Sequence, residues 1–337
     1  MAVNLQIKNL TKTIHRTKYT AIDPANPANS ATGKTVLITG GATGIGFAIA
    51  RSFAAAGAKV LVLLARRGQV LEESAEKLRK EFKAEETKVW TYAVDLKEEK
   101  DISAVFEDIN AKLKLEGGDD EHNDINILVT SAVYMQHGLP VLAYDKEDFR
   151  EAFETNVLGN LNVVRAFLGP AAAAVRVTGL SEPNGLGRTP HERQKQGVDK
   201  TGNSKVREKI IIDVSTNSTY VPYPSTALYA PTKYYFTYML RHLQNELTQL
   251  DAPRVRVHSF HPGEIFTPAA ERAGIKQDTY DFDDESLPGG FAVWLASPAA
   301  DFLKGRFLFA RWDVDEIVAM RQRFEQDEEL CRIVLRV

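Results

Sequence analysis

Short apolar runs alternate with amphipathic stretches along the first third of the chain. Each run has the length of a buried β-strand, and in each following stretch apolar residues recur at the spacing of one helix face. This alternation predicts an α/β fold, a doubly wound parallel sheet with helices on both faces. The predicted strands are 35–39, 59–64 and 88–94, and the helical pattern follows at Phe47, Ala50, Phe53 and Ala54, at 70–82 and at 97–115.

The same alternation continues to the end of the chain, and we expect one domain over 33–313. Further strands are predicted at 125–131, 209–214, 254–260 and 306–309, and further helices at 147–174, 229–251 and 290–295.

Four segments depart from the pattern. Turn signals at Asp23-Pro24 and Asn26-Pro27 predict an extended arm for 1–32. Segment 176–208 is rich in Gly, Pro and charge, and this composition predicts a flexible insertion. The acidic segment 264–287 separates two strands and is expected to cover the substrate. Residues 314–337 are expected to form a tail helix.

Composition and charge exclude several classes of protein. Of 337 residues, 42 are Lys or Arg and 45 are Asp or Glu, so the net charge of −3 disfavours a nucleic-acid partner. Cys331 is the single cysteine, which excludes an internal disulfide and a cysteine-based metal site, and no metal is expected. No apolar run is long enough to cross a membrane, so the chain is expected to be cytoplasmic. The basic, acid-free first 18 residues leave two interpretations open, a basic surface arm and an organelle presequence.

A glycine-rich turn follows the first predicted strand and opens a helix, in the sequence from Thr39 to Gly46. Glycine permits positive φ in such a turn, and the lack of side chains lets backbone N–H groups approach a pyrophosphate. This position in a first βαβ unit predicts dinucleotide binding.

Two arginines, Arg66 and Arg67, end the second predicted strand. In dinucleotide-binding folds an acid near this edge accepts from the ribose 2′-hydroxyl, whereas a cation accommodates a 2′-phosphate. Since no acid is present here, the sequence favours NADP(H) over NAD(H).

A tyrosine and a lysine four residues apart, Tyr229 and Lys233, share one face of a predicted helix. A cation near a phenol favours phenolate, so Lys233 is expected to lower the pKa of Tyr229 and make it a usable acid or base. Ser215 and Thr216 end the preceding strand and offer hydroxyl donors.

Together these residues resemble the short-chain dehydrogenase/reductase family, single-domain Rossmann enzymes with a Tyr-Lys-Ser-Asn catalytic set, over about 33–313. The resemblance implies catalytic roles for Tyr229, Lys233 and Asn156, the last fixing a water that relays protons. The family serine lies thirteen residues before the tyrosine, where this chain has Thr216, so either Thr216 or Ser215 polarises the substrate oxygen. The implied cofactor-binding residues are Gly40, Thr43, Gly44, Ile45, Gly46, Arg66, Arg67, Asp95, Leu96, Lys233, Pro262, Gly263, Ile265 and Thr267.

Two further departures from the family pattern stand out. The fourth strand ends in Thr130-Ser131-Ala132-Val133, where the family has Asn-Asn-Ala-Gly, and the insertion 176–208 replaces a short connection. The arm ending at Asp23-Pro24 and the segment from Trp312 to Glu316 resemble fungal members that act on secondary metabolites.

The expected function is therefore an NADP(H)-dependent oxidoreductase that interconverts a ketone and a secondary alcohol by hydride transfer, with Tyr229 as acid or base. Two alternatives stay open, a non-redox dehydratase or isomerase using the same site and a non-catalytic nucleotide-binding partner protein. The expected partner is a small-molecule carbonyl or alcohol, with neither nucleic acid nor membrane. The resemblance also implies a homodimer or homotetramer formed through the helices that begin near Glu147 and Tyr229.

Overall fold

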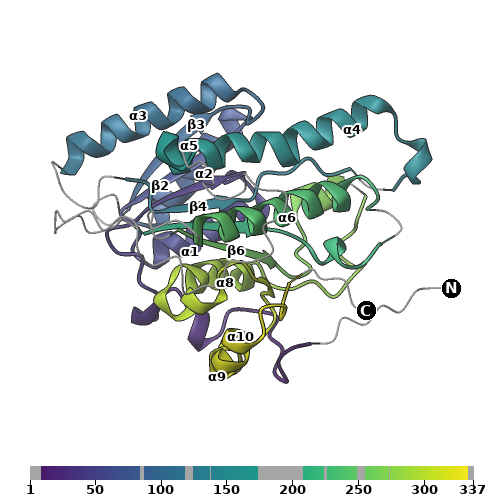
Figure 1. Cartoon of the computed structure of the whole chain (residues 1–337). Helices are drawn as coiled ribbons and strands as arrows, with labels where there is room; N and C mark the ends of the chain where they lie inside the picture. Colours follow the sequence, from purple (N-terminus) through teal and green to yellow (C-terminus); the bar gives the residue numbers. More distant parts are fainter. Residues whose placement is uncertain are drawn as a thin grey trace, which may run out of the picture.

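Seven parallel strands form one sheet in the order β3-β2-β1-β4-β5-β6-β7 within the described part of the chain (Figure 1). The computed structural model describes residues 9–83, 87–117, 124–136, 138–173, 208–223, 226–248, 255–272 and 274–332. The strands are β1 (Thr35–Thr39), β2 (Val60–Ala65), β3 (Lys88–Ala93), β4 (Ile127–Thr130), β5 (Lys209–Val214), β6 (Val255–His261) and β7 (Phe307–Phe309). The doubly wound parallel sheet predicted from the sequence is confirmed.

Successive strand residues alternate between two cores. Val36 and Ile38 of β1 pack into one core, and Leu37 between them packs into the other. Because both faces are covered, all five residues of β1 are buried, which explains why the strands read as continuous apolar runs.

Helices form a layer on each face of the sheet (Figure 1). Helices α1 (Gly44–Ala55), α2 (Gly68–Glu81) and α8 (Ser286–Ala296) contribute to the first core, and α3 (Glu99–Gly117), α5 (Asn160–Ala173) and α6 (Tyr229–Thr248) to the second. The remaining helices are α4 (Lys146–Phe153), α7 (Pro268–Arg272), α9 (Val314–Ala319) and α10 (Arg321–Gln326).

The helix predicted over 147–174 is irregular in the structure, with a π-helical turn near its middle and a non-helical Gly169 (φ +74°) near its end. Helix α4 runs into a π-helical turn, η4 (Glu154–Gly159), which leads into α5. Single π-turns are rare inside helices and are found mostly at functional sites. Here the turn carries Asn156, one of the predicted catalytic residues.

The N-terminal arm is part of the packed structure. Ile22 lies in the first 3₁₀ turn, η1 (Thr20–Ile22), and is fully buried in the core beside α8. A side chain at Gly290 of α8 would place its Cβ 2.5 Å from the Ile22 carbonyl oxygen, so glycine there lets the arm approach. Figure 1 shows the arm, in purple, beside the yellow C-terminal helices.

The C-terminal segment differs from the single tail helix expected for 314–337. Helices α9 and α10 are short and meet at Met320, and turns follow up to Arg332. Asp313 caps α9 by accepting a hydrogen bond from the Glu316 amide. The insertion predicted at 176–208 lies outside the described residues, apart from Glu208.

Candidate active site

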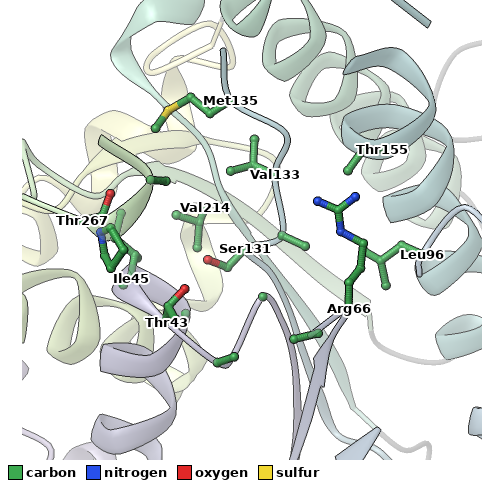
Figure 2. A pocket seen from close by; sticks show the side chains of 18 of the residues that line it. Thr43, Ile45, Arg66, Leu96, Ser131, Val133, Met135, Thr155, Val214 and Thr267 are labelled. Carbon is green, nitrogen blue, oxygen red and sulfur yellow. The ribbon is translucent and has the colours of Figure 1, made fainter. Parts of the chain in front are cut away.

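A cavity of about 480 Å³ opens at the carboxyl ends of the strands. It lies where the strand order reverses between β1 and β4, the place where doubly wound sheets bind ligands. Figure 2 shows Arg66 and Leu96 on one side, Thr43, Ile45 and Thr267 on the other, and Val214 and Ser131 between them.

The turn between β1 and α1 brings backbone groups to the cavity. Gly40 has φ +67°, and a Cβ there would lie 2.9 Å from the Cα of Ala132. A Cβ at Gly46 would lie 2.4 Å from the Gly40 carbonyl oxygen. The turn therefore closes only with glycine at both positions. Thr43 makes no side-chain cap to α1, so the first amides of this 12-residue helix point to the cavity as donors suited to a phosphate.

Both predicted arginines at the end of β2 line the cavity. The Nη1 atom of Arg66 lies 3.5 Å from a carboxylate oxygen of Glu151 and 3.9 Å from one of Asp95, and the Arg66 side chain is half exposed. Glu151, which the sequence analysis did not single out, also accepts a 2.7 Å hydrogen bond from Lys97. This edge thus holds cations that a phosphate could contact, together with carboxylates that compete for them.

The predicted hydroxyls at the end of β5 point to different partners. The Ser215 hydroxyl is 2.7 Å from that of Thr237 on α6, whereas Thr216 is hydrogen-bonded to the Tyr229 hydroxyl. Ser215 lines the cavity, but its buried hydroxyl is hydrogen-bonded to Thr237.

Lys233 is paired with a residue that the sequence analysis missed. Its ammonium nitrogen lies 3.1 Å from a carboxylate oxygen of Asp213, and both side chains are almost fully buried. Asp213 also accepts a 2.8 Å hydrogen bond from Thr237. Asp213 follows three isoleucines in the strand Lys209–Val214. An acid in such an apolar run is the sequence signal that could have revealed this pair, because a buried charge requires a partner.

The surroundings of Tyr229 raise its pKa, in contrast to the expected lowering by Lys233. Burial disfavours the phenolate, and the negative charges of Asp213 and Glu264 act in the same direction, while the hydrogen bond from Thr216 acts against them. Because Asp213 pairs with Lys233, the cation that should favour phenolate is largely neutralised in this state.

Asn156 is held entirely by protein groups. Its amide oxygen accepts from the Tyr134 backbone N–H at 2.6 Å, and its amide nitrogen donates to the Tyr134 carbonyl and to the Thr232 hydroxyl, both at 2.9 Å. Its side chain thus joins the loop after β4 to the residue before Lys233. The predicted role in fixing a water remains a prediction.

The loop after β4 forms a wall of the cavity despite its departure from the family pattern. The Thr39 hydroxyl accepts from the backbone N–H groups of Ser131 and Ala132, each at 3.0 Å, so the loop is tied to the end of β1. Ser131, Ala132 and Val133 all line the cavity.

Most of the predicted cofactor-binding residues meet at this cavity. Gly263 and Ile265 are not among its lining residues, and neither are Thr216 and Asn156. Arg272 at the end of α7 is a lining residue that sequence reasoning missed, since an arginine in an irregular segment carries no positional signal. The predicted cofactor-binding residues that line the cavity are Gly40, Thr43, Gly44, Ile45, Gly46, Arg66, Arg67, Asp95, Leu96, Lys233, Pro262 and Thr267.

The described residues hold no group of three or more histidine, cysteine or acidic side chains placed to bind a metal ion. None of the helices described is both long and apolar enough to span a bilayer.

Comparison with known proteins places this geometry in a family. A family model for short chain dehydrogenases matches residues 34–174. A short chain dehydrogenase/reductase of Claviceps purpurea is 31% identical over 326 residues, covering 96% of this chain and 94% of the relative. The short chain dehydrogenase/reductase nsrO of Aspergillus novofumigatus is 30% identical over 326 residues and covers 96% of both chains.

Solved structures show the same fold at lower identity. The L-sorbose reductase from Gluconobacter frateurii, complexed with NADPH and L-sorbose, is 22% identical with a TM-score of 0.61, and the match covers 84% of this chain and 96% of that one. A 7α-hydroxysteroid dehydrogenase complexed with NADH is 19% identical with a TM-score of 0.61, over 87% and 97% of the two chains. With relatives at 30% identity along nearly its whole length, this chain belongs to the short-chain dehydrogenase/reductase family of oxidoreductases.

Proposed function

We propose that the protein is an NADP(H)-dependent oxidoreductase that interconverts a ketone and a secondary alcohol, acting on a secondary-metabolite type of substrate. The observation that carries the proposal is that Tyr229 and Lys233 line the same cavity as the glycine turn and Arg66. A dinucleotide lying along this cavity would have its phosphates at the amino end of α1 and its reactive end beside Tyr229.

Each residue of the site has its own role in the reaction. The nicotinamide, when bound, supplies or accepts the hydride. Tyr229 gives a proton to the substrate oxygen during reduction and removes it during oxidation. Thr216 donates a hydrogen bond to the same oxygen. The Lys233 cation, although paired with Asp213, offsets part of the cost of forming the Tyr229 phenolate. Asn156 fixes the loop after β4 relative to helix α6 through its hydrogen bonds to Tyr134 and Thr232.

The test of this function is turnover of ketones with both reduced cofactors, followed by nicotinamide absorbance and by product mass. Oxidation of NADPH with gain of two hydrogens in the product is expected. A change of product without a change in absorbance would indicate a dehydratase or isomerase. Cofactor binding without any turnover would indicate a nucleotide-binding partner protein.

Arg66 is the residue on which cofactor selectivity should depend. The family includes neighbours solved with NADPH and with NADH, so the fold alone does not select the cofactor. A contact from a half-exposed guanidinium to a 2′-phosphate should be worth about 1.5 to 3 kcal/mol, or roughly ten- to hundredfold in affinity. Arg66→Asp should therefore weaken NADPH binding by that factor and leave NADH binding nearly unchanged.

Titration of the wild-type protein and Arg66→Asp with both cofactors measures this effect. Arg51→Asp is the matched control, because Arg51 pairs with Glu81 on the surface and does not line the cavity. Tighter binding of NADH than of NADPH by the wild-type protein would contradict the proposal.

Asp213 should set the pH dependence of alcohol oxidation. Oxidation requires deprotonated Tyr229, so the rate rises as pH passes the pKa of that residue. The Asp213 carboxylate raises this pKa, and Asp213→Asn removes the charge while keeping an acceptor for Thr237. The midpoint of the pH–rate profile should therefore move to lower pH.

Thr237→Val is the control for this profile, because it removes a hydrogen bond from the same network without removing a charge. The control should leave the midpoint in place. A midpoint that moves upward in Asp213→Asn would show that the carboxylate favours the phenolate and would contradict the assignment.

The outer faces of α4 and α6 support the expected homodimer or homotetramer. Phe153 of α4 and Tyr235 of α6 are 38% and 52% exposed, and their rings meet edge to face at 5.4 Å. Phe149, Tyr234 and Tyr238 extend this exposed apolar surface. Surfaces of this kind are commonly covered by another chain. A monomer in sedimentation equilibrium at micromolar concentration would argue against an oligomer.

A further inference from the structure

A buried carboxylate, Asp283, joins three distant parts of the chain. Its side chain has no exposed surface, and its oxygens accept from Nε of Arg311 at 2.6 Å and from Nε of Arg16 at 3.0 Å. One of these oxygens also accepts from the Glu264 backbone N–H at 2.9 Å. A charge without access to water is stable in this place only because these donors surround it.

Asp283 holds the beginning and the end of one segment together. Besides the side-chain contact, its backbone N–H donates to the Glu264 carbonyl at 2.7 Å. Gly263 has φ +95°, and a Cβ there would lie 2.4 Å from a carboxylate oxygen of Asp283. Glycine is therefore required at this position both by its backbone conformation and by the close approach of Asp283.

The segment between these two points forms one wall of the cofactor cavity. Thr267, Pro268, Ala269 and Arg272 line the cavity, and all lie between Glu264 and Asp283 in sequence. Fixing the two ends of a loop reduces the conformations open to the residues between them. The contacts of Asp283 thus determine the position of this cavity wall.

The N-terminal arm supplies one of the two cations. Arg16 binds Asp283 with its side chain, contacts Asp281 through its guanidinium, and accepts from the Asp284 backbone N–H at 2.8 Å. The neighbouring His15 donates its backbone N–H to the Arg311 carbonyl at 2.8 Å. Arm, cavity wall and C-terminal segment therefore meet at one buried group.

We propose that Arg16 and Asp283 are positioning residues that hold the wall formed by residues 264–272 and 274–283 in its cofactor-binding arrangement. The N-terminal arm then contributes to the active site, although none of its described residues lines the cavity. The inference rests on the proposed function in one respect, that the cofactor occupies this cavity.

Arg16→Gln is the informative variant, because Arg16 is 42% exposed and Arg311 still balances the buried carboxylate in its absence. Losing the charge-assisted hydrogen bond to Asp283 and the guanidinium contacts with Asp281 should make opening of the wall at least about tenfold more frequent. Backbone amides of residues 264–283 should exchange hydrogen about tenfold faster, measured without cofactor. KM for NADPH should rise by a similar factor, with a much smaller change in kcat.

Two further variants complete the test. Arg16→Lys keeps a cation and should restore part of both effects. Lys18→Gln removes an exposed pair with Asp23 from the same arm and should change neither measurement. Unchanged amide exchange in Arg16→Gln would overturn the inference, whether or not the wild-type protein binds NADPH. Failure of the wild-type protein to bind NADPH would overturn the proposed function and leave the exchange result intact.

Discussion

Tyr229→Phe is expected to lower turnover by about 10² or more while leaving NADPH affinity nearly unchanged. The substitution deletes one hydroxyl, the proposed proton donor, and keeps the ring. The lost hydroxyl is hydrogen-bonded to Thr216, and the phenylalanine ring fills the same space as the tyrosine ring. We therefore expect the fold and the cofactor site to persist, with the loss confined to kcat.

The measurement is single-turnover kinetics combined with a cofactor titration. Tyr235→Phe is the matched control, since Tyr235 lies on the same helix with its side chain on the outer face. Near-normal turnover in Tyr229→Phe would mean that another group moves the proton. Loss of NADPH binding together with activity would instead assign Tyr229 to the cofactor site.

Thr216→Val is expected to lower turnover by about 10² to 10³, whereas Ser215→Ala should have a small effect. Valine keeps the shape of threonine and removes the hydroxyl that contacts Tyr229. The Ser215 hydroxyl is bonded to Thr237 instead, so its removal costs one buried hydrogen bond, about 1 kcal/mol of stability, and no contact at the substrate oxygen.

Comparing kcat and the free energy of unfolding in both variants separates the two roles. Ser215→Ala should unfold at slightly lower denaturant concentration with kcat nearly intact. Thr216→Val should lose most of kcat, and its stability should fall slightly too, because the Thr216 hydroxyl also accepts from the Ser218 backbone N–H. A crippled Ser215→Ala with an almost normal Thr216→Val would show that Ser215 turns toward the substrate during the reaction.

The local pattern of apolar and polar residues was sufficient to predict most of the fold. The strand predicted at 35–39 coincides with β1, and the one at 209–214 coincides with β5, because strands buried on both faces are mostly apolar. The predictions were wrong where irregular structure intervenes. Neither the π-turn at Glu154–Gly159 nor the break at Met320 interrupts the apolar periodicity, so the sequence predicted one helix in each place.

The residues of the candidate site likewise include some that the sequence could predict and some that it could not. Gly40 and Gly46 were predictable because a turn imposes its requirement on the residues that form it. Glu151 beside Arg66 was not, since 85 positions separate two groups whose attraction depends only on distance in space. The pKa of Tyr229 was misjudged for the same reason. Helical spacing brings Lys233 near it, but burial of the phenol raises its pKa, and the neighbouring strand supplies a carboxylate that pairs with Lys233.

By itself the sequence determined the alternation of strands and helices, the glycine turn and the Tyr229–Lys233 pair, because each depends on residues close together in the chain. Only the tertiary structure decided which hydroxyl meets Tyr229, how Asp213 balances Lys233, and that Arg16 of the arm reaches Asp283. Charges and hydroxyls act over a few ångströms in any direction, and their partners are set by packing of the whole chain.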